Sequence, residues 1–590
     1  MAPQLQINQG PQDALLYDNS RSYFTNVGYV RTSNFQVEYK TVEPQNEPNW
    51  GGTFSFVIPK AADLLGPVDL QMELKCSNSG FSGLNTNSTA AADNTRAWSE
   101  YVDEVGLAMI EKVTFSVGSN DIESITGEQL HLMNELMTSD EMRLGYKTTL
   151  KTGKAAFTDQ HSYAAITTSG TAYNQTKPVQ TVAELGKNAW DDSGQSDSFF
   201  TKTPNTGAAH SRVISYALNG GSATGNVSST KKLSVPLGLF FTKHVSQYFP
   251  LAAVAGCNDV RITIKLRPIN SLVKLNGFVG DRGSGTATWK MPTIEKPAEC
   301  RLMCHYVHVT GPEAQLLMNK EHVRLLKLFQ HHHTTFKSSE REWSMNLSFL
   351  HPVSTLIVTI RRAYDVDNTE APTISCDCSI SGGSKQPLYD ADWSQTGKGY
   401  FFYHGDGQHP NYDARRLTAG IHENGETGAG VDTASIELGT VKVNSIQLSL
   451  NGQDRHPGLS KGIEMDYLNS RLLPMLHSNS NQYQKQLLAT QGSSAANQMQ
   501  YGLQGSKNII VFPFSLNPEG SNPSGAVNFS KVSHATLKLH MEAAKDTGML
   551  RNAAHGNSGG TDPSDYRVDV YALHYNWLQI KDGRALLSFA

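Results

Sequence analysis

The most regular feature of this sequence is an alternation of apolar and polar residues with a period of two. Successive side chains of a β-strand point to opposite faces, so the alternation predicts strands with one buried and one polar face. Because such runs recur along the whole chain, we expect antiparallel sheets arranged as sandwiches or barrels. The alternating runs cover residues 68–76, 113–117, 260–266, 446–450, 535–541 and 568–572.

Helical signals are few. The clearest begins near Thr126, where Gln129 follows three residues later as in a capping box, and Leu130, Met133 and Met137 then form an apolar face. A second candidate helix covers residues 463–476, and a weaker third covers residues 313–326. The chain is therefore predicted to be almost entirely β.

An internal repeat divides the chain into two similar halves. Residues 110–121 read IEKVTFSVGSND and residues 443–454 read VNSIQLSLNGQD, so the apolar positions, the central Ser and the final Asp coincide. Each segment is a predicted strand that runs into a turn and then into one of the two clearest helices. A second pair joins a proline-containing entry, at Pro250 or Pro523, to a long alternating strand. The shared order predicts two copies of one β-domain.

The length of 590 residues also exceeds one ordinary domain. We expect an N-terminal arm over residues 1–20, a first domain over 21–270, a glycine- and proline-rich linker over 271–300, and a second domain over 301–590. Two stretches without periodicity, at about 150–230 and 380–435, are predicted insertions; loops of that length are usually functional, and the plain alternative is disorder. Their aromatic residues favour loops that pack on something: Phe199, Phe200, Trp393, Tyr400, Phe401, Phe402 and Tyr403.

Charge and cysteine content narrow the class of protein. The net charge is −4 and no Lys/Arg-rich run occurs, so direct binding to a genome is not expected. Six cysteines are spread over the chain, the first residues do not resemble a signal peptide, and no apolar run approaches the ~20 residues that span a bilayer. These features predict a soluble product of a reducing compartment, the cytoplasm.

One motif for nucleophilic catalysis is present but poorly placed. Gly458-Leu-Ser460-Lys-Gly462 fits the G-x-S-x-G pattern, which needs a strand, a sharp turn and a helix to expose the serine. Here the predicted strand ends near Leu450, and residues 454–457 also intervene before the motif. A pair of carboxylates could support glycoside hydrolysis on a β-sandwich, but the sequence offers no spacing test for it. We therefore predict no catalytic residues.

The spacing of the candidate metal ligands also does not match that of common metal sites. On a strand, His331 and His333 would share a face and His332 would oppose them, but two ligands do not make a zinc site, so a polar loop or strand end is the preferred interpretation. Four cysteines, Cys300, Cys304, Cys376 and Cys378, lack the common C-x-x-C spacing, and Cys304 is expected to pack as a small apolar residue. The glycines of residues 280–285 lack the lysine of a phosphate-binding loop. No metal and no cofactor are predicted.

Several stretches resemble one family, the double jelly-roll major capsid proteins of nucleocytoplasmic large DNA viruses, which include iridovirus, algal phycodnavirus, mimivirus and African swine fever virus proteins. The block around Pro523-Ser-Gly and Asn528-Phe-Ser is the most specific match, although Asn522 and Lys531 replace the family's usual Gln and Arg. The other matching stretches are residues 12–17 (QDALLY), 22–27 (SYFTNV), 29–35 (YVRTSNF), 110–118, 127–136, 512–519 and 575–589.

The resemblance implies an all-β fold of two tandem eight-stranded jelly-roll sandwiches, with a few short helices and long loop insertions. It implies a homotrimer whose six barrels form a pseudo-hexameric capsomer of an icosahedral virion shell, assembled in the host cytoplasm. The implied partners are neighbouring capsomers, minor capsid and penton proteins, and viral membrane proteins beneath the shell, with no direct nucleic-acid contact. The insertions would project outward and contact neighbouring chains.

Two other functions stay open at the level of sequence. One is a carbohydrate-binding or adhesive β-sandwich protein. The other is a β-sandwich hydrolase that uses Ser460 or a carboxylate pair. Loss of esterase activity in a Ser460→Ala variant would favour the hydrolase.

Overall fold

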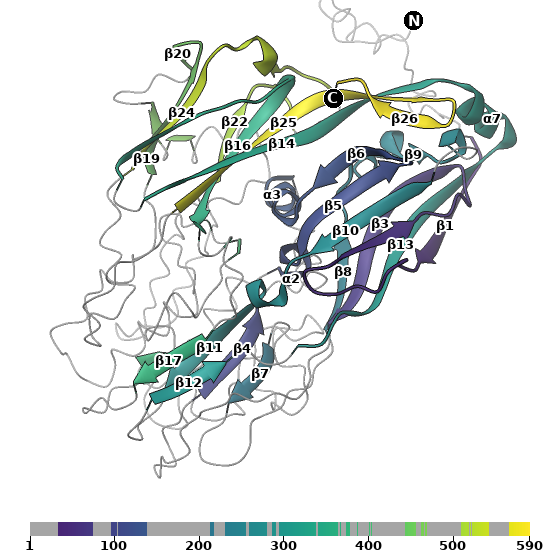
Figure 1. The fold of residues 1–590 in the computed structure, drawn as a ribbon. Helices are drawn as coiled ribbons and strands as arrows, with labels where there is room; N and C mark the ends of the chain where they lie inside the picture. The colour runs from purple at the N-terminus through teal and green to yellow at the C-terminus, as the bar shows by residue number, and fades with distance from the viewer. Residues whose placement is uncertain are drawn as a thin grey trace, which may run out of the picture.

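The computed structural model contains two β-sandwiches and a group of strands set apart from them (Figure 1). The structure describes residues 33–74, 96–102, 104–137, 213–217, 231–254, 259–279, 286–290, 294–337, 340–363, 366, 373–377, 386–387, 400–401, 403, 443–455, 462–464, 467–468, 509–518, 520, 522–541 and 566–589.

The first sandwich is built from two antiparallel sheets. One sheet has the order β1-β13-β3-β8, with β9 added to β3, and the other has the order β2-β10-β5-β6. Apart from the β5–β6 hairpin and the neighbours β8 and β9, successive strands alternate between the two sheets, as in a jelly roll. The strands are β1 (Phe35–Val42), β2 (Thr53–Val57), β3 (Leu64–Leu74), β5 (Ile110–Val117), β6 (Asn120–Ile125), β8 (Lys231–Pro236), β9 (Phe249–Pro250), β10 (Val260–Leu266) and β13 (Ala298–Val309).

The second sandwich repeats this arrangement. Its sheets have the orders β14-β25-β16-β22 and β15-β24-β19-β20; β23 pairs with β16, β26 with β25, and β21 with β19. The strands are β14 (His322–Phe336), β15 (Glu342–Asn346), β16 (Pro352–Arg362), β19 (Val443–Leu450), β20 (Gln453–Asp454), β21 (Ile463–Glu464), β22 (Ile509–Pro513), β23 (Val527–Asn528), β24 (Ala535–Met541), β25 (Tyr566–Lys581) and β26 (Arg584–Leu587).

Each strand of the first sandwich has a counterpart in the same place of the second, which adds β21 and β26; this confirms the predicted tandem of jelly rolls. The repeated segments form equivalent hairpins: β5 turns into β6 through Gly118, and β19 turns into β20 through Asn451 and Gly452. Gly118, Asn451 and Gly452 all have positive φ, a conformation that glycine and asparagine adopt most readily. The proline-containing entries also correspond, because β9 and β23 each pair with the equivalent strand of their own sheet, β3 or β16.

Four strands form a separate sheet of order β18-β11-β4-β7, in which β7 and β18 come from the two predicted insertions and β11 from the predicted linker. Figure 1 places this sheet, together with the pair β12–β17, beyond one end of the sandwiches. Because β4, β7 and β11 come from the first half and β18 from the second, both halves contribute to it. The strands are β4 (Arg96–Tyr101), β7 (Val213–Ala217), β11 (Val273–Val279), β12 (Thr286–Lys290), β17 (Thr373–Asp377) and β18 (Gln386–Pro387).

The domain limits remain a prediction, but strand pairing suggests a different boundary. The expected linker, residues 271–300, contains β11 and β12, and β13 pairs with both β1 and β3 of the first sandwich. Residues 301–309, predicted to open the second domain, therefore complete the first sheet. The glycines of residues 271–300 suggested a linker, but loops and the ends of strands are also rich in glycine. We propose that the boundary lies near Thr310.

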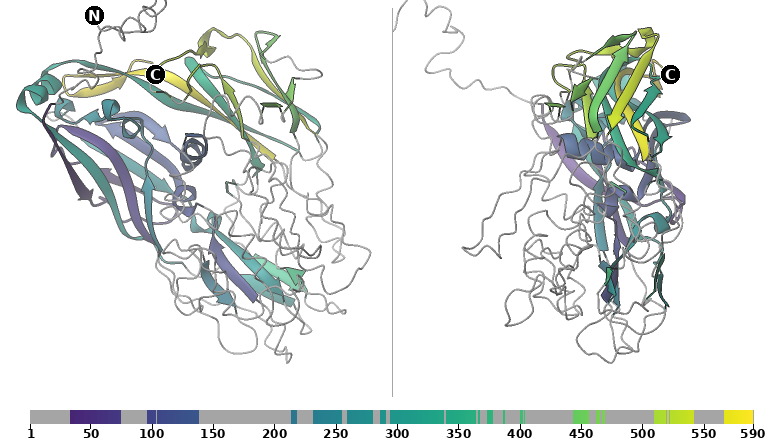
Figure 2. Two further views of the ribbon diagram at one scale, coloured as in Figure 1. Left: turned by 180° about the vertical axis from the view of Figure 1, so that it is seen from behind. Right: turned by 90° about the vertical axis from the view of Figure 1, so that its left-hand side faces the viewer.

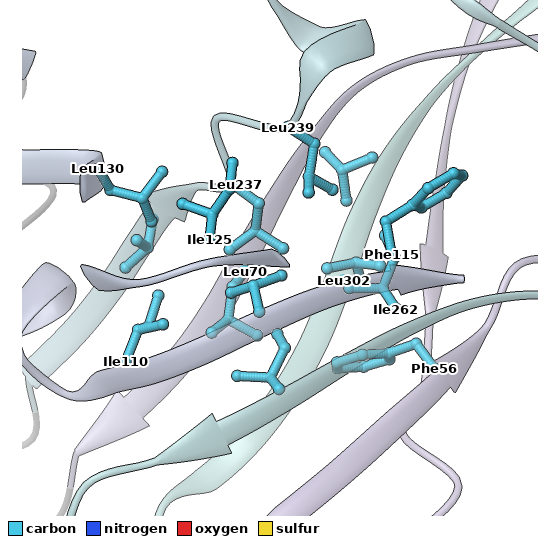
Figure 3. Packing of buried hydrophobic residues seen from close by; sticks show 14 of the residues in the cluster. Phe56, Leu70, Ile110, Phe115, Ile125, Leu130, Leu237, Leu239, Ile262 and Leu302 are labelled. Atoms are coloured by element: carbon cyan, nitrogen blue, oxygen red, sulfur yellow. The ribbon is translucent and has the colours of Figure 1, made fainter. Parts of the chain in front are cut away.

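The alternation of apolar and polar residues fills two main cores. In β10 the side chains of Val260, Ile262, Ile264 and Leu266 are buried while the intervening residues are exposed or half-buried, and β24 follows the same pattern. Figure 3 shows Phe56, Leu70, Phe115, Ile262 and Leu302 converging from five strands of the first sandwich. A second cluster fills the other sandwich and includes Leu356, Val358, Leu448, Leu537 and Val570.

The helices are short, as predicted. Helix α3 (Gly127–Met137) begins with the expected capping box: the Thr126 N–H donates to Gln129 Oε1 (2.9 Å), and the Gln129 N–H donates to Thr126 Oγ1 (3.3 Å). The third candidate ends earlier than predicted, because α7 (Gly311–Asn319) stops before β14 begins at His322. The second candidate is wrong at its start, where Ile463–Glu464 is strand β21; most of its remainder lies outside the described residues. The other helical segments are α2 (Val105–Ala108) and the 3-10 turns η3 (Phe240–Thr242), η4 (Val245–Gln247), η5 (Ala252–Val254), η6 (Ile269–Ser271) and η10 (Phe529–Lys531).

Two long strands connect the sandwiches. β14 and β25 pair over their full overlap, from His322 opposite Ile580 to Phe336 opposite Tyr566. One end of this pair packs on the first core through Leu326, Leu328, Leu578 and Ile580. The other end belongs to the second sandwich, so the pair reaches across both halves (Figure 2). Among the described residues, no helix is long and apolar enough to cross a membrane.

Candidate functional site

A buried cluster of charged residues lies where helix α3 of the first half meets the sheet of the second half. Figures 1 and 2 both place α3 between the two sandwiches. The centre of the cluster is Arg361 near the end of β16, whose side chain is 1% exposed. A guanidinium so deeply buried requires compensating partners, because loss of hydration costs several kcal/mol per ion.

Two carboxylates, one from each half, share this guanidinium. Arg361 Nη2 donates to Asp569 Oδ2 on β25 (2.9 Å) and to Glu128 Oε2 on α3. The Thr359 hydroxyl donates to Glu128 Oε1 (3.2 Å), and the Tyr571 hydroxyl donates to Glu128 Oε2. Glu128 is therefore held by three groups of the second half, although it belongs to the first.

Asp569 connects the cluster to the outer strand β14. Its Oδ1 atom accepts from Arg567 Nε (2.9 Å) and lies 2.8 Å from His331 Nε2. The His331 ring stacks on Tyr571, with ring centroids 4.5 Å apart. Asp569 is fully buried, whereas His331 is partly exposed, so the chain of contacts leads from the molecular interior to the surface.

The pKa values of the two carboxyl groups are shifted in opposite directions. Burial disfavours the charged form of Asp569, but the charge of Arg361 and the bond to His331 outweigh it and hold its pKa below the ordinary value. Burial raises the pKa of Glu128, and Arg361 only partly opposes this effect. Because both carboxyl groups contact Arg361, they titrate together.

Aromatic residues from the predicted insertion cover the cluster. Arg361 Nη1 donates to the Tyr400 carbonyl (3.1 Å), and the guanidinium of Arg267 lies 4.2 Å from the centre of the Tyr400 ring. Phe401 stacks on His131 of α3, with ring centroids 4.1 Å apart, and Tyr403 is fully buried. This confirms that the aromatic residues at 400, 401 and 403 pack against the protein; Phe402, Phe199, Phe200 and Trp393 lie outside the described residues.

Apolar residues complete the contact between the halves. Leu132 and Leu136 of α3 pack with Ile357 of β16 and with Ile509 and Val511 of β22. The sheet of the second half is thus covered on both faces, by its own core and by α3. The cluster offers no uncompensated nucleophile, and its arrangement suits it to fix one sandwich relative to the other. We call Glu128, Arg361, Asp569 and Tyr571 the charged clamp.

A cavity of about 740 Å³ lies beside the clamp, on another side of α3. Leu130 and Met133 of α3 and Leu237 form part of its apolar wall, and Asn517 and Gly520 of the second half also line it. Its ionisable lining groups are Asp69, Lys243 and His244, and burial raises the pKa of Asp69.

The structure places the sequence candidates in different environments. His331 and His333 lie within β14 and not in a loop or at a strand end, and they come together with Asp569. Cys300 and Cys304 lie on β13 with free, buried thiols, and burial raises the pKa of each to about 12, which confirms the apolar role expected for Cys304. Ser460, Cys378 and residues 280–285 lie outside the described residues, as does the Cys376 side chain.

The charged cluster itself was missed by the sequence analysis. Arg361 and Asp569 occupy the polar positions of alternating strands, which predicts exposure to solvent. They are buried because a helix from the other half covers that face. A charged residue inside a strongly apolar strand, such as Asp569 between Val568 and Val570, was the one signal available.

Comparison with known proteins assigns the chain to a family. Residues 22–168 and 189–309 match the family model described as the major capsid protein N-terminus, and residues 498–585 match the large eukaryotic DNA virus major capsid protein. The chain belongs to the major capsid proteins of large eukaryotic DNA viruses. The first of these matches ends at residue 309, which is also the last residue of β13.

Two relatives of this capsid protein match over nearly their whole length. The major capsid proteins of Phaeocystis pouchetii virus and Chrysochromulina ericina virus are each 21% identical, over 98% of both chains. In fold, the chain is similar to the solved PBCV-1 virus capsid, with a TM-score of 0.54, 14% identity and coverage of 96% and 100%. It is also similar to the Faustovirus major capsid protein, with a TM-score of 0.52, 12% identity and coverage of 95% and 93%. This capsid protein is therefore a structural component of a viral shell.

Proposed function

We propose that three copies of this capsid protein form a capsomer with a nearly hexagonal outline. One observation supports this: the two halves have the same order of strands in both of their sheets. Three chains arranged around a three-fold axis would present six similar sandwiches, an arrangement that can pack in a hexagonal lattice. A single gene product would then tile the flat faces of an icosahedral shell.

The charged clamp supports this role. In a capsomer the two sandwiches of one chain must keep a fixed angle, or the six-fold outline is lost. Glu128 joined to Arg361 and Tyr571, together with the apolar packing of α3, fixes that angle within the chain. The separate sheet of order β18-β11-β4-β7, to which both halves contribute strands, also links them.

The mass in solution tests the trimer. Light scattering of the purified chain is expected to give three times its 64.5 kDa mass, unchanged over a hundredfold dilution. Negative-stain images of the same sample should show hexagonal outlines. A monomeric mass in a sample that melts cooperatively would refute the proposal, because cooperative melting excludes misfolding as the cause.

We also infer that the protein has no catalytic role and that its partners are proteins of the particle. The partners proposed are neighbouring capsomers, minor capsid and penton proteins, and viral membrane proteins beneath the shell, with assembly in the host cytoplasm. Cross-linking of purified virions with mass spectrometry would identify these neighbours. Equal, background-level hydrolysis of simple esters by the wild type and Ser460→Ala is expected; activity that disappears in the variant would favour the hydrolase.

The absence of direct DNA binding is a separate expectation. The net charge of −4 supplies no general attraction for phosphate groups. Filter binding of the purified chain to duplex DNA should therefore show no retention at low salt. Binding that falls steeply as salt increases would contradict this expectation.

A further inference from the structure

Two histidines and one carboxylate meet on adjacent strands of the second sandwich. His331 and His333 are separated by one residue on β14, so their side chains lie on the same face of the strand. Asp569 of β25 pairs directly opposite His333. One ligand atom of each residue lies within 4.8 Å of the others, and the rings of His331 and His333 are stacked 5.5 Å apart.

We propose that His331, His333 and Asp569 bind a divalent first-row transition-metal ion, and that Zn²⁺ matches the site best. Two imidazoles and one carboxylate, with a fourth position left for water, are a common ligand set for zinc. Imidazole ligands favour Zn²⁺, Cu²⁺ or Ni²⁺ over Mg²⁺ and Ca²⁺, which prefer oxygen ligands. Both histidines are exposed, so an ion can enter from solvent and keep a water ligand.

The site needs only small movements to bind an ion. Zn–N and Zn–O bonds of about 2.0–2.2 Å in a tetrahedron place ligand atoms about 3.3 Å apart. His331 Nε2 and Asp569 Oδ1, now 2.8 Å apart, would separate by about half an ångström. The three ligand atoms lie within 4.8 Å of one another, so rotation of the exposed His333 side chain would bring its ring toward the other two.

The surrounding residues orient the carboxylate and balance much of its charge. Arg361 holds Asp569 Oδ2, so the carboxylate presents Oδ1 toward the histidines. Supporting bonds of this kind commonly fix metal-binding carboxylates. The charge of Arg361 is shared with Glu128, which limits its repulsion of a cation. Arg567 also donates to Asp569 Oδ1 and would share that oxygen with the ion.

Such an ion would connect β14 to β25, the two long strands that reach across both sandwiches. It would stabilise the native chain because Asp569 lies more than 230 residues from the two histidines along the chain and meets them only in the folded state. This inference does not depend on the proposed trimer, since the ligands come from a single chain.

The test uses the full chain, treated with EDTA and then freed of chelator. Co²⁺ titration is expected to produce the visible absorption bands of a four- or five-coordinate site, and calorimetry with Zn²⁺ should give one tight equivalent per chain. His333→Ala should weaken Zn²⁺ binding at least about tenfold, as loss of even a supporting residue commonly does. The matched control is His332→Ala, on the opposite face of the same strand, which should bind like the wild type.

A second measurement separates binding from misfolding. Zn²⁺ should raise the melting temperature of the wild type and of His332→Ala, but not that of His333→Ala, and the three metal-free proteins should melt alike. Should His333→Ala not fold, His333→Gln replaces it. Equal Zn²⁺ affinity in the wild type and the folded His333 variant would overturn the proposal, as would the absence of cobalt bands in the wild type.

Discussion

Replacing Arg361 with methionine should destabilise this capsid protein by the cost of leaving two carboxylates buried without their shared cation. Arg361 is 1% exposed, Glu128 3% and Asp569 0%, so water cannot take over the role of the guanidinium. Removing one partner of a buried ion pair typically costs about 3–5 kcal/mol. Methionine fills a similar length of apolar stem, so this cost is due mainly to charge and not to a cavity.

The expected change in melting temperature follows from the size of the unit that unfolds. The entropy of unfolding is about 2.1 cal/mol/K per residue. If about 280 residues of the second half melt together, 3–5 kcal/mol corresponds to roughly 5–9 °C, and if the whole chain melts together, to roughly 2–4 °C. Differential scanning calorimetry at fixed protein concentration measures this shift and shows how many transitions occur.

Two further variants test the cause. Arg261→Met removes a half-exposed arginine of β10, paired with Asp259 at 3.5 Å, and should change stability by less than about 0.5 kcal/mol. The triple variant Arg361→Met/Glu128→Gln/Asp569→Asn removes the stranded charges and should recover much of the loss. If Arg361→Met melts no lower than Arg261→Met, or if the triple variant recovers nothing, the argument from uncompensated charge is refuted.

Three other predictions concern the buried groups and the close approach of α3. Burial raises the pKa of Glu123 to about 7, so between pH 4.5 and 7 the folded protein binds a proton that the unfolded chain has lost. The wild type therefore loses stability as the pH rises through this range. Thermal melts of Glu123→Gln should show a stability gain relative to the wild type that grows to about 3 kcal/mol between pH 5 and 8. Burial lowers the pKa of His574 to about 4, so the wild type loses stability as the pH falls from 6.5 to 4. His574→Gln should lose less stability over the same pH range. Equal pH profiles of stability in the two proteins would show that His574 does not cause the acid destabilisation. A Cβ atom at Gly127 would lie 2.2 Å from the Leu107 carbonyl oxygen, so Gly127→Ala should lower the free energy of unfolding in urea by about 2 kcal/mol or more. The control is Gly311→Ala, whose Cβ would have no atom within 4 Å. This variant should be neutral or slightly stabilising.

The repeated elements of the fold could be predicted because their signals are local. A strand with one buried face needs only alternation, and the β5–β6 and β19–β20 hairpins add a turn residue with positive φ at a fixed place. The capping box of α3 lies within four residues. The start of β21 was missed because a short strand and the first turn of a helix have similar compositions.

The proposed metal ligands show which part of the site a local sequence pattern could not predict. The spacing of His331 and His333 correctly implied a shared face if they lay on a strand, yet the third ligand is more than 230 residues away along the chain. Only the register of β14 with β25 brings Asp569 opposite His333. A single sequence contains no signal for that register, since many neighbouring polar residues could have taken the same place.

The charged clamp lies where the joining of two sandwiches in one chain covers a sheet face that would otherwise be exposed. Each jelly roll can bury one face of each sheet within itself, but joining two of them also covers a second face, on which the alternating pattern has placed Arg361 and Asp569. Burying Arg361 there is tolerated because Asp569 from the same sheet and Glu128 from the other sandwich both pair with it. An apolar patch at this contact would bind equally well in several orientations, whereas a shared guanidinium with directional bonds accepts few. The polar face therefore supplies what a rigid shell subunit requires: a single angle between its halves, set by hydrogen bonds that are lost when the halves rotate.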